Sequence, residues 1–410
     1  MPMKRKILVA LFLFLHMLIL SGCWSNKELT DLAFVIAIGF DKSEDGKIVG
    51  TFQIVNPSNV AGGLQGGTMG DASAVTVYTS TGKNVYEVTR QASSKLSRIL
   101  YYSHANLLVI GEQLAKEEGL YRVLDTLDRD IQFRNTAKVV IAHETKAEDI
   151  LKVTTPVDKI PANKIMKTLK FSEELWGGHV TVNIRDVLES LSLPGKETII
   201  PVFKVRGSLK EGKNISNLQN TEPKATLSAD GLAIFKEDKM IDWVDTRKAR
   251  GIVWTLDKIK ETNVPVDWGD KKDAITYQVL REKTKVTTDF SNGNPVISIR
   301  IQVKGNVGEV DVPINLKDLN VRNKINEKVE KRIKEQVHAS LKHAQSKKAD
   351  IFGFGENIYR NHPQAWDRLK KDWNEEHFPE LKVKVTVDAA IVRTGLKNSP
   401  YLYQMKNNSE

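Results

Sequence analysis

Cysteine is almost missing from this sequence: the 410 residues contain one, Cys23. A single cysteine excludes an internal disulfide, and it excludes zinc sites that are built from several thiolates. With 40% hydrophobic and 27% charged residues, the composition is that of an ordinary globular protein. Burial of apolar side chains must therefore hold the folded part together, which is reasonable for a chain of this length.

Long apolar runs are missing as well beyond the first 22 residues. No later stretch approaches the roughly 20 consecutive apolar residues that a membrane-spanning helix needs. We therefore expect the chain after Gly22 to have no transmembrane helix of its own.

Motifs for catalysis and metal binding are also missing. Neither a His-Glu-x-x-His nor a Gly-x-Ser-x-Gly motif occurs, and His338 and His343 are five residues apart, so they do not share one helix face. Ser103 and His104 are neighbours in the sequence, but the members of a catalytic triad come from distant segments. We interpret His104 as a partly buried side chain at a strand start. We predict that the protein is not an enzyme and holds neither a metal nor a cofactor.

Carboxylates are plentiful and are the remaining candidates for catalysis. Asp350 and Glu356 flank a glycine-containing turn, where capping of the turn and of the following helix explains both residues. Sequence spacing does not fix the distance between two carboxyl groups, so we assign neither a catalytic role.

Aromatic residues make up only 7% of the chain and are not interleaved with basic residues as they are in single-strand binders. The net charge is nevertheless +10, or +7 without Lys4, Arg5 and Lys6. Because the first 23 residues have the pattern of an export signal, described next, we expect no nucleic acid partner. The charge instead suits an anionic membrane surface or an acidic protein.

The leader itself has the pattern of an export signal. Residues 4–6 are basic with no acid nearby, and residues 7–20 are apolar except for one histidine. This apolar stretch is too short to cross a bilayer comfortably. Residues 20–23 are Leu-Ser-Gly-Cys, the pattern of a lipobox, in which small residues let a peptidase reach the backbone just before the cysteine.

We predict cleavage between Gly22 and Cys23 and attachment of a diacylglyceryl group to the Cys23 thiol. The alternative is an incidental thiol beside an ordinary cleavage site, but the basic start, the apolar stretch and the spacing together favour lipidation. Each buried CH₂ contributes about 0.8 kcal/mol, so two or more acyl chains hold a protein stably at a membrane. We therefore expect a protein tethered to the outer face of a membrane.

Strand and helix patterns alternate along the chain, which predicts an α+β or mixed α/β fold with several domains, mixed sheets and packed helices. We expect a lipoprotein signal peptide at 1–22, an N-terminal α/β domain at 23–156, a middle segment or domain at 157–224, a C-terminal α/β domain at 225–395 and a polar tail at 396–410.

Individual elements follow from the periodicity of apolar residues. Strands are predicted at 32–41, 48–55, 74–80, 105–110, 136–142, 198–205, 225–235, 240–244 and 381–393. Helices are predicted at 83–98, 112–128, 147–152, 246–259 and 364–376, and the segment 158–193 is mostly helical. Asp245 can cap the helix at 246–259, and the last helix carries Trp366, Leu369 and Trp373 on one side. The segments 274–289 and 295–307 predict a long hairpin, whose second strand alternates apolar residues such as Ile299 with polar ones such as Arg300.

The longest predicted helix covers 321–349 and has an apolar residue at every fourth position, with many lysines and arginines on its other faces. Such a basic amphipathic helix could lie on anionic lipid or dock on a membrane partner. Alternatively, it faces the core of its own domain. The apolar stripe is narrow and lacks interfacial aromatic residues, which favours the second interpretation.

Several short segments, taken in their order along the chain, carry a family resemblance. They are Gly22-Cys23-Trp24, Glu28-Leu29, Asp31-Leu32-Ala33, Ser103-His104, residues 110–115, Arg129-Asp130, residues 231–236, Arg250-Gly251-Ile252, residues 350–355, Trp366, Trp373 and Arg393-Thr394-Gly395. Over essentially the whole chain, this pattern resembles the Ger(x)C family, the C subunits of spore nutrient germinant receptors. Ser25 departs from the pattern, which has an acidic residue there, but the departure leaves the lipidation prediction unchanged.

The resemblance implies a lipoprotein of the spore inner membrane that acts with membrane-spanning A and B receptor subunits when nutrients trigger germination. It implies several mixed α/β domains and no catalytic residues, so Cys23 is the functional position that it carries over. The rival hypothesis is a solute-binding lipoprotein of a transporter, which would need a ligand cleft between two lobes.

Overall fold

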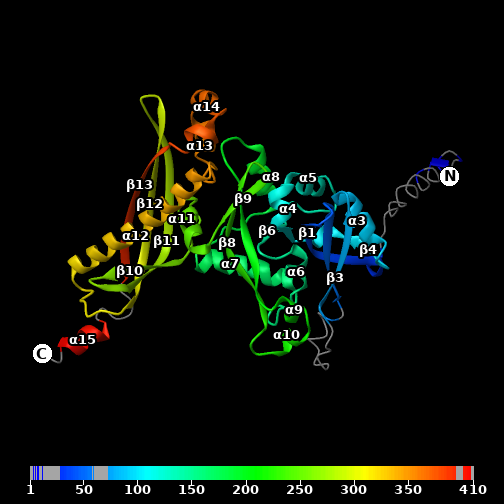
Figure 1. Cartoon of the computed structure of the whole chain (residues 1–410), viewed down its shortest axis with the longest axis horizontal. Helices are drawn as coiled ribbons and strands as arrows, with labels where there is room; N and C mark the ends of the chain where they lie inside the picture. The colour runs from blue at the N-terminus through cyan, green and yellow to red at the C-terminus, as the bar shows by residue number, and fades with distance from the viewer. Residues whose placement is uncertain are drawn as a thin grey trace.

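The computed structural model describes residues 28–57, 59, 73–393 and 400–407, together with residues 3, 5, 7, 8 and 12. These residues form two mixed sheets with packed helices, which confirms the predicted fold class. Figure 1 shows the two sheets following one another along the long axis of the molecule. Within the described ranges, no helix has both the length and the apolar character needed to cross a membrane.

The first sheet has nine strands. Along its path lie β3 (Val75–Gly82), β2 (Ile48–Val55), β1 (Leu32–Lys42), β5 (Leu107–Gly111), β6 (Lys138–Ala142), β7 (Ile199–Gly207), β8 (Ala225–Lys236) and β9 (Lys239–Val244), and β4 (Ile99–Tyr101) pairs with β1 beside this path. The central strands β1, β5, β6 and β7 are parallel, whereas both flanks are antiparallel. Parallel strands are covered on both faces, which explains why β5 is a continuous apolar run.

Helices cover both faces of this sheet. One face packs against α3 (Val85–Ser93), α4 (Glu112–Glu117), α5 (Tyr121–Asp128) and α8 (Ile184–Ser192), and the other against α6 (Ala147–Lys152) and α7 (Pro161–Leu175). Two short helices, α9 (Leu209–Gly212) and α10 (Ser216–Gln219), follow β7. The single helix predicted at 112–128 is two helices, because Gly119 takes a positive φ of 81° and turns the chain between them.

The second sheet has four strands, β10 (Thr262–Trp268), β11 (Lys271–Ser291), β12 (Asn294–Val310) and β13 (Lys382–Arg393). The first three are antiparallel, and β13 is parallel to β12. The predicted hairpin is confirmed as β11 and β12. Its two-residue turn places Asn292 and Gly293 at positive φ, the conformation that these residue types favour in hairpins.

Two helices complete this part of the chain. In α12 (Leu319–Ser346), the predicted apolar stripe is buried in one core with the inward residues of β12, which confirms the core-facing interpretation. Figure 1 shows α12 running diagonally across the strands. The helix α11 (Thr246–Thr255) begins at the predicted Asp245 cap, whose carboxylate accepts from the backbone N–H groups of Arg247 and Lys248. It ends four residues earlier than predicted.

The helix predicted at 364–376 is interrupted. Its residues form α14 (Pro363–Leu369), which follows α13 (Phe354–Asn361), and then a separate π-helical turn at Trp373–His377. Trp366, Leu369 and Trp373 are all buried. The Trp373 indole N–H donates to the Asp350 carboxylate at 3.0 Å, a contact that was not predicted.

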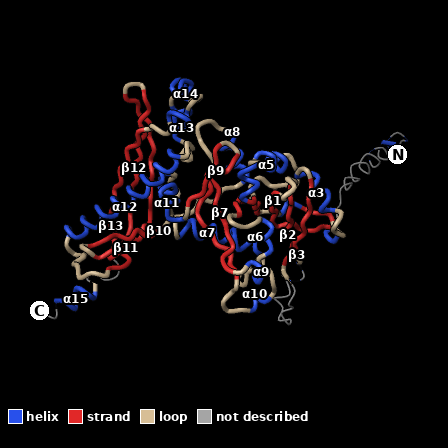
Figure 2. Tube along the Cα trace, viewed as in Figure 1, coloured by secondary structure: helices blue, strands red, loops and turns tan. Residues whose placement is uncertain are grey.

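Two short strands were not predicted: β4 has three residues, and β10 contains a proline at position 265. The sheets also divide the chain differently from the predicted segments. Strands β8 and β9 belong to the first sheet, and the second sheet begins at Thr262. In Figure 2 the strands, drawn in red, fall into these two groups. The segment boundaries near 156 and 225 stay predictions about domains. In the predicted tail, α15 (Tyr401–Asn407) forms a last helix.

Candidate functional site

Cys23 and Gly22 lie outside the described residues, so lipidation and cleavage stay predictions. The first strand, β1, begins at Leu32, nine positions after Cys23. The folded body therefore starts close in sequence to the predicted attachment point.

Ser103 and His104 lie in a 3₁₀ turn between β4 and β5. His104 is exposed and packs against the rings of Phe34 and Tyr101, with centroids 5.4 and 5.7 Å away. The prediction of a partly buried histidine at a strand start was wrong, because β5 begins only at Leu107 and leaves His104 at the surface. Across the described ranges, no three His, Cys, Asp or Glu residues are placed to hold a metal ion.

The functional candidate that the structure adds is a junction between the two sheets, which we call the clasp. It consists of Gly195 and Glu197 before β7 and of Asp350, Gly355, Trp373 and Asn374 around α13. These residues come from the two ends of a long stretch of chain, and the contacts between them fix the position of α13 against the first sheet.

Asp350 is the centre of the clasp. Its carboxylate is fully buried. It accepts hydrogen bonds from the backbone N–H groups of Phe352 at 3.2 Å, Gly353 at 3.0 Å and Gly355 at 2.8 Å. A fourth hydrogen bond comes from Trp373 Nε1 at 3.0 Å. Burial raises the pKa of Asp350 to about 6, against the opposing effect of these hydrogen bonds. The predicted capping role is confirmed for Asp350, since these N–H groups belong to the turn before α13 and to its first turn. Glu356, for which capping was also predicted, instead accepts from Arg360 Nε at 2.9 Å.

Two glycines form the closest backbone contact of the clasp. Gly195 has a positive φ of 79°, and a Cβ built on it would lie 2.4 Å from the carbonyl carbon of Gly355. A Cβ on Gly355 would meet Trp373 Nε1 at 2.6 Å. The Gly195 carbonyl accepts the backbone N–H of Glu356 at 2.9 Å. Only glycine allows this approach of the two segments.

Glu197 forms the polar side of the clasp. Its backbone N–H donates to the Asp350 carbonyl at 2.8 Å, and its carboxylate accepts from Asn374 Nδ2 at 2.5 Å and from the Glu237 N–H at 2.7 Å. Burial is the main cause that raises the pKa of Glu197, and the nearby Asp350 acts in the same direction. Sequence reasoning missed Glu197, because nothing in its local pattern marks it as buried.

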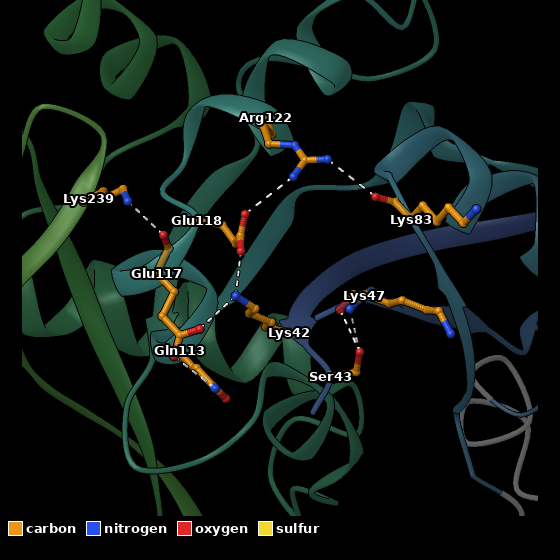
Figure 3. A network of polar contacts seen from close by, with 9 residues as sticks. All are labelled: Lys42, Ser43, Lys47, Lys83, Gln113, Glu117, Glu118, Arg122 and Lys239. Atoms are coloured by element: carbon orange, nitrogen blue, oxygen red, sulfur yellow. Dashed lines mark hydrogen bonds and ion pairs between the residues drawn. The ribbon is translucent and has the colours of Figure 1, made fainter. Parts of the chain in front are cut away.

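A second polar network lies where β1 ends (Figure 3). Lys42 Nζ lies 2.8 Å from a Glu117 carboxylate oxygen and 2.6 Å from one of Glu118. Arg122 lies 3.5 Å from Glu118, and Lys239 Nζ donates to the Glu117 carbonyl oxygen at 2.9 Å. The network links the first strand to α4, α5 and β9.

The residue before Lys42 has a different role. Asp41 is buried, and its carboxylate accepts the N–H groups of Ala147 at 2.8 Å and Glu148 at 3.0 Å, so that it caps α6. Burial is the main cause that raises its pKa. The acids and bases at this end of β1 satisfy one another or the backbone, and the arrangement is suited to holding elements in place.

Comparison with known proteins gives consistent matches over nearly the whole chain. Residues 25–205 match the model described as "Spore germination protein N-terminal domain", and residues 230–395 match "Spore germination B3/ GerAC like, C-terminal". The chain is 45% identical over 406 residues to "Spore germination protein KC" of Bacillus subtilis (strain 168), covering 99% of this chain and 100% of that protein.

More distant relatives cover similar lengths. "Spore germination protein GerQC" of Bacillus cereus is 25% identical, covering 96% of this chain and 99% of that protein. A crystal structure of the GerBC protein matches with a TM-score of 0.55 at 20% identity, covering 90% of this chain and all of that one. At that identity the match shows a shared multidomain fold.

Proposed function

This chain belongs to the Ger(x)C family of spore germination proteins, and from that membership we propose that it is a lipid-anchored C subunit of a nutrient germinant receptor. It acts with membrane-spanning A and B subunits on the outer face of the spore inner membrane. The observation that carries the proposal is the 45% identity to a spore germination protein over 99% of the chain.

The leader supports the anchored part of the proposal. Its basic start, short apolar stretch and Leu-Ser-Gly-Cys sequence place one thiol, Cys23, where a lipid would be attached. The strand β1 begins at Leu32, so the anchor holds the folded body close to the bilayer.

A non-enzymatic role agrees with the polar groups of the body. Asp350 and Glu197 bind backbone N–H groups and other side chains within the clasp, and Asp41 caps a helix. The buried carboxylates described above thus have structural partners. We propose that the body works by assembly with the other receptor subunits, and that the clasp keeps its two sheets in a fixed relation.

Replacement of Cys23 by Ala tests the anchor. We expect Cys23→Ala to abolish lipid attachment, to release the chain from the spore membrane fraction and to weaken germination in response to nutrients. Mass spectrometry of the N-terminal peptide, membrane fractionation and the fall in optical density of a spore suspension measure these three effects.

Ser25→Ala is the matched control, because it changes a neighbouring small polar residue and leaves the lipobox intact. It should retain lipid, membrane location and germination. Full membrane retention and normal germination of the Cys23→Ala variant would reject the proposal. Crosslinking in spores, followed by identification of the captured proteins, tests the partnership with A and B subunits.

A solute-binding lipoprotein of a transporter is the second candidate. A hollow of about 310 Å³ lies beside the clasp and is lined by both parts of the chain, including Glu189, Lys196, Glu197, Leu256, Lys258 and Glu356. Calorimetry of the purified chain against amino acids and sugars separates the two functions. Tight binding by this chain alone would favour the second candidate.

A further inference from the structure

The four-stranded sheet has two unlike faces. Inward residues of β12, such as Ile299 and Ile301, are buried under α12. Between them, Arg300, Gln302 and Lys304 point to the opposite face and are exposed. Cationic side chains dominate this outward face. We define the basic sheet face as Arg281 and Lys285 of β11, Arg300 and Lys304 of β12, and Lys382 and Lys384 of β13, which are all exposed.

Like charges lie directly opposite each other on this face. Lys285 is in register with Arg300, and Arg281 is in register with Lys304. Directly opposed like charges destabilise a sheet, because the side chains are only about 5 Å apart at Cβ. These opposed pairs of like charges therefore lower the stability of the isolated sheet.

Little within the described chain offsets this charge. The six cations form no ion pair or hydrogen bond with another described side chain, whereas nearby Lys283 lies 2.7 Å from Asp257. On the same face, Asp388 is in register with the neutral Gln302. On this face, the acids at positions 289 and 309 lie toward the two ends of the sheet. Glu282 lies in the middle of β11, but it is in register with Val303, a residue of the inward face. An anionic partner outside the chain would relieve the repulsion.

We propose that the basic sheet face binds the anionic headgroups of a phospholipid bilayer. This inference rests on the proposed function, because the Cys23 lipid is what keeps the body beside a membrane. One lipid anchor combined with a polybasic patch holds a protein at a membrane more firmly than either does alone. Each lysine or arginine near an anionic surface contributes about 1 kcal/mol.

The composition of the face favours lipid over an acidic protein. Protein interfaces are enriched in aromatic residues and depleted in lysine, and their binding energy is concentrated in a few buried anchors. The cations here are mostly lysines, and the uncharged outward residues between them include Thr287, Ser298, Gln302, Thr386 and Ala390, which are small or polar. Lys283 and Asp388 lie on the same face, each in register with Gln302. The charges also spread over three strands spaced about 4.8 Å apart, which suits a planar array of headgroups.

The test uses the lipidated chain in vesicles of phosphatidylcholine alone or of an equimolar mixture with phosphatidylglycerol. Because lipid occupies Cys23, a Gln302→Cys substitution gives one thiol for a fluorophore at the centre of the face. Quenching by a nitroxide lipid headgroup reports contact with the bilayer. A Glu327→Cys reporter on the exposed side of α12 serves as the positional control.

We expect quenching at position 302 only in the anionic vesicles, and loss of this quenching at high salt because exposed charges are then screened. The triple variant Lys285→Glu/Arg300→Glu/Lys304→Glu removes three attractions and adds three repulsions, so it should lower the fraction of chain whose basic sheet face contacts the bilayer, relative to the fraction that does not, by at least roughly a hundredfold. The matched variant Lys328→Glu/Lys331→Glu/Lys342→Glu changes the net charge equally on α12 and should leave the quenching intact. Circular dichroism verifies that both variants are folded.

Three results would overturn the inference: equal quenching in neutral vesicles, loss of quenching in the α12 variant alone, or binding of the face to polyglutamate but not to anionic vesicles. The last result would assign the face to an acidic protein. Binding of the wild-type chain to neutral vesicles measures membrane anchoring by the acyl chains without a contribution from the basic sheet face. Failure of the proposed function is thereby distinguished from failure of the basic sheet face.

Discussion

At the scale of single residues, Asp350 is a fully buried carboxylate held by hydrogen bonds from both ends of the clasp turn and from Trp373. A buried carboxylate is costly unless hydrogen bonds compensate the loss of water, and here four donors do so. The same burial raises its pKa to about 6. Asp350 is therefore both a structural acceptor and a group whose protonation is coupled to folding.

We expect Asp350→Asn to lower the free energy of unfolding at pH 7 by roughly 1–3 kcal/mol, because the amide has one acceptor oxygen for several buried N–H groups. The loss should depend on pH. In the wild type, the folded state keeps the Asp350 proton up to about pH 6, whereas the unfolded state releases it near 3.8. The wild type thus loses stability as pH rises from about 4 to 6, and its advantage over the variant shrinks across that window.

Urea unfolding from pH 4 to 7 measures this difference. The exposed Asp388 of the same part of the chain supplies the control, since Asp388→Asn should change stability by less than about 0.5 kcal/mol. A difference between wild type and Asp350→Asn that stays constant across the pH range would contradict the assignment.

At the scale of elements, the contact between α11 and α12 depends on one glycine. A Cβ on Gly251 would lie 2.1 Å from the Gln336 carbonyl oxygen and 2.2 Å from Ser340 Oγ. Two polar contacts flank this point: Ser340 Oγ donates to the Lys248 carbonyl at 2.7 Å, and Trp254 Nε1 donates to Gln336 Oε1 at 3.0 Å. The two helices can pack this closely only because position 251 has no side chain.

Gly251→Ala should destabilise the protein by about 1–3 kcal/mol, because the added methyl group forces the helices apart. The change would be visible as a lower midpoint in thermal or urea unfolding. Gly308→Ala is the control, since a Cβ there meets its nearest atom at an ordinary 3.6 Å. Equal stability of the Gly251 and Gly308 variants would show that the helix contact is not close-packed in solution.

At the scale of the whole molecule, the two sheets share one apolar core. Leu232 and Ile234 of β8 belong to the first sheet, yet they pack in the same cluster as Trp254 of α11 and Ile299 of β12. The clasp joins the same two parts through polar contacts. An apolar interface of this kind couples the stability of the parts it joins.

Leu232→Ala should therefore weaken both sheets together. We expect a loss of about 2–5 kcal/mol from removal of a fully buried leucine side chain. Hydrogen exchange should show the same decrease in amide protection in β5 and in β12. The half-exposed Leu280 is the control, and Leu280→Ala should leave both protected. Unchanged protection of β12 in the Leu232 variant would mean that the sheets unfold independently.

Local features of the chain were open to sequence reasoning because periodicity is a local property. The alternation of Ile299 and Arg300 predicted the two faces of β12, Asp245 predicted the start of α11, and the stripe of α12 predicted its burial. The predicted leader and the predicted lipidation of Cys23 likewise rest on short spacing alone. The family resemblance also came from the sequence, and the comparisons confirm it.

The tertiary structure decided what depends on distant partners. Periodicity does not reveal that Gly195 meets Gly355, that Glu197 binds Asn374, or that β8 extends the first sheet. It marked Arg300 as exposed, but the register of the strands set Lys285 beside it. The sequence alone determined which faces are apolar, and it predicts where a lipid would attach, since neighbours in the chain encode both. Only the tertiary structure shows which segments meet, because contacts between residues far apart in the sequence depend on how whole helices and strands pack together.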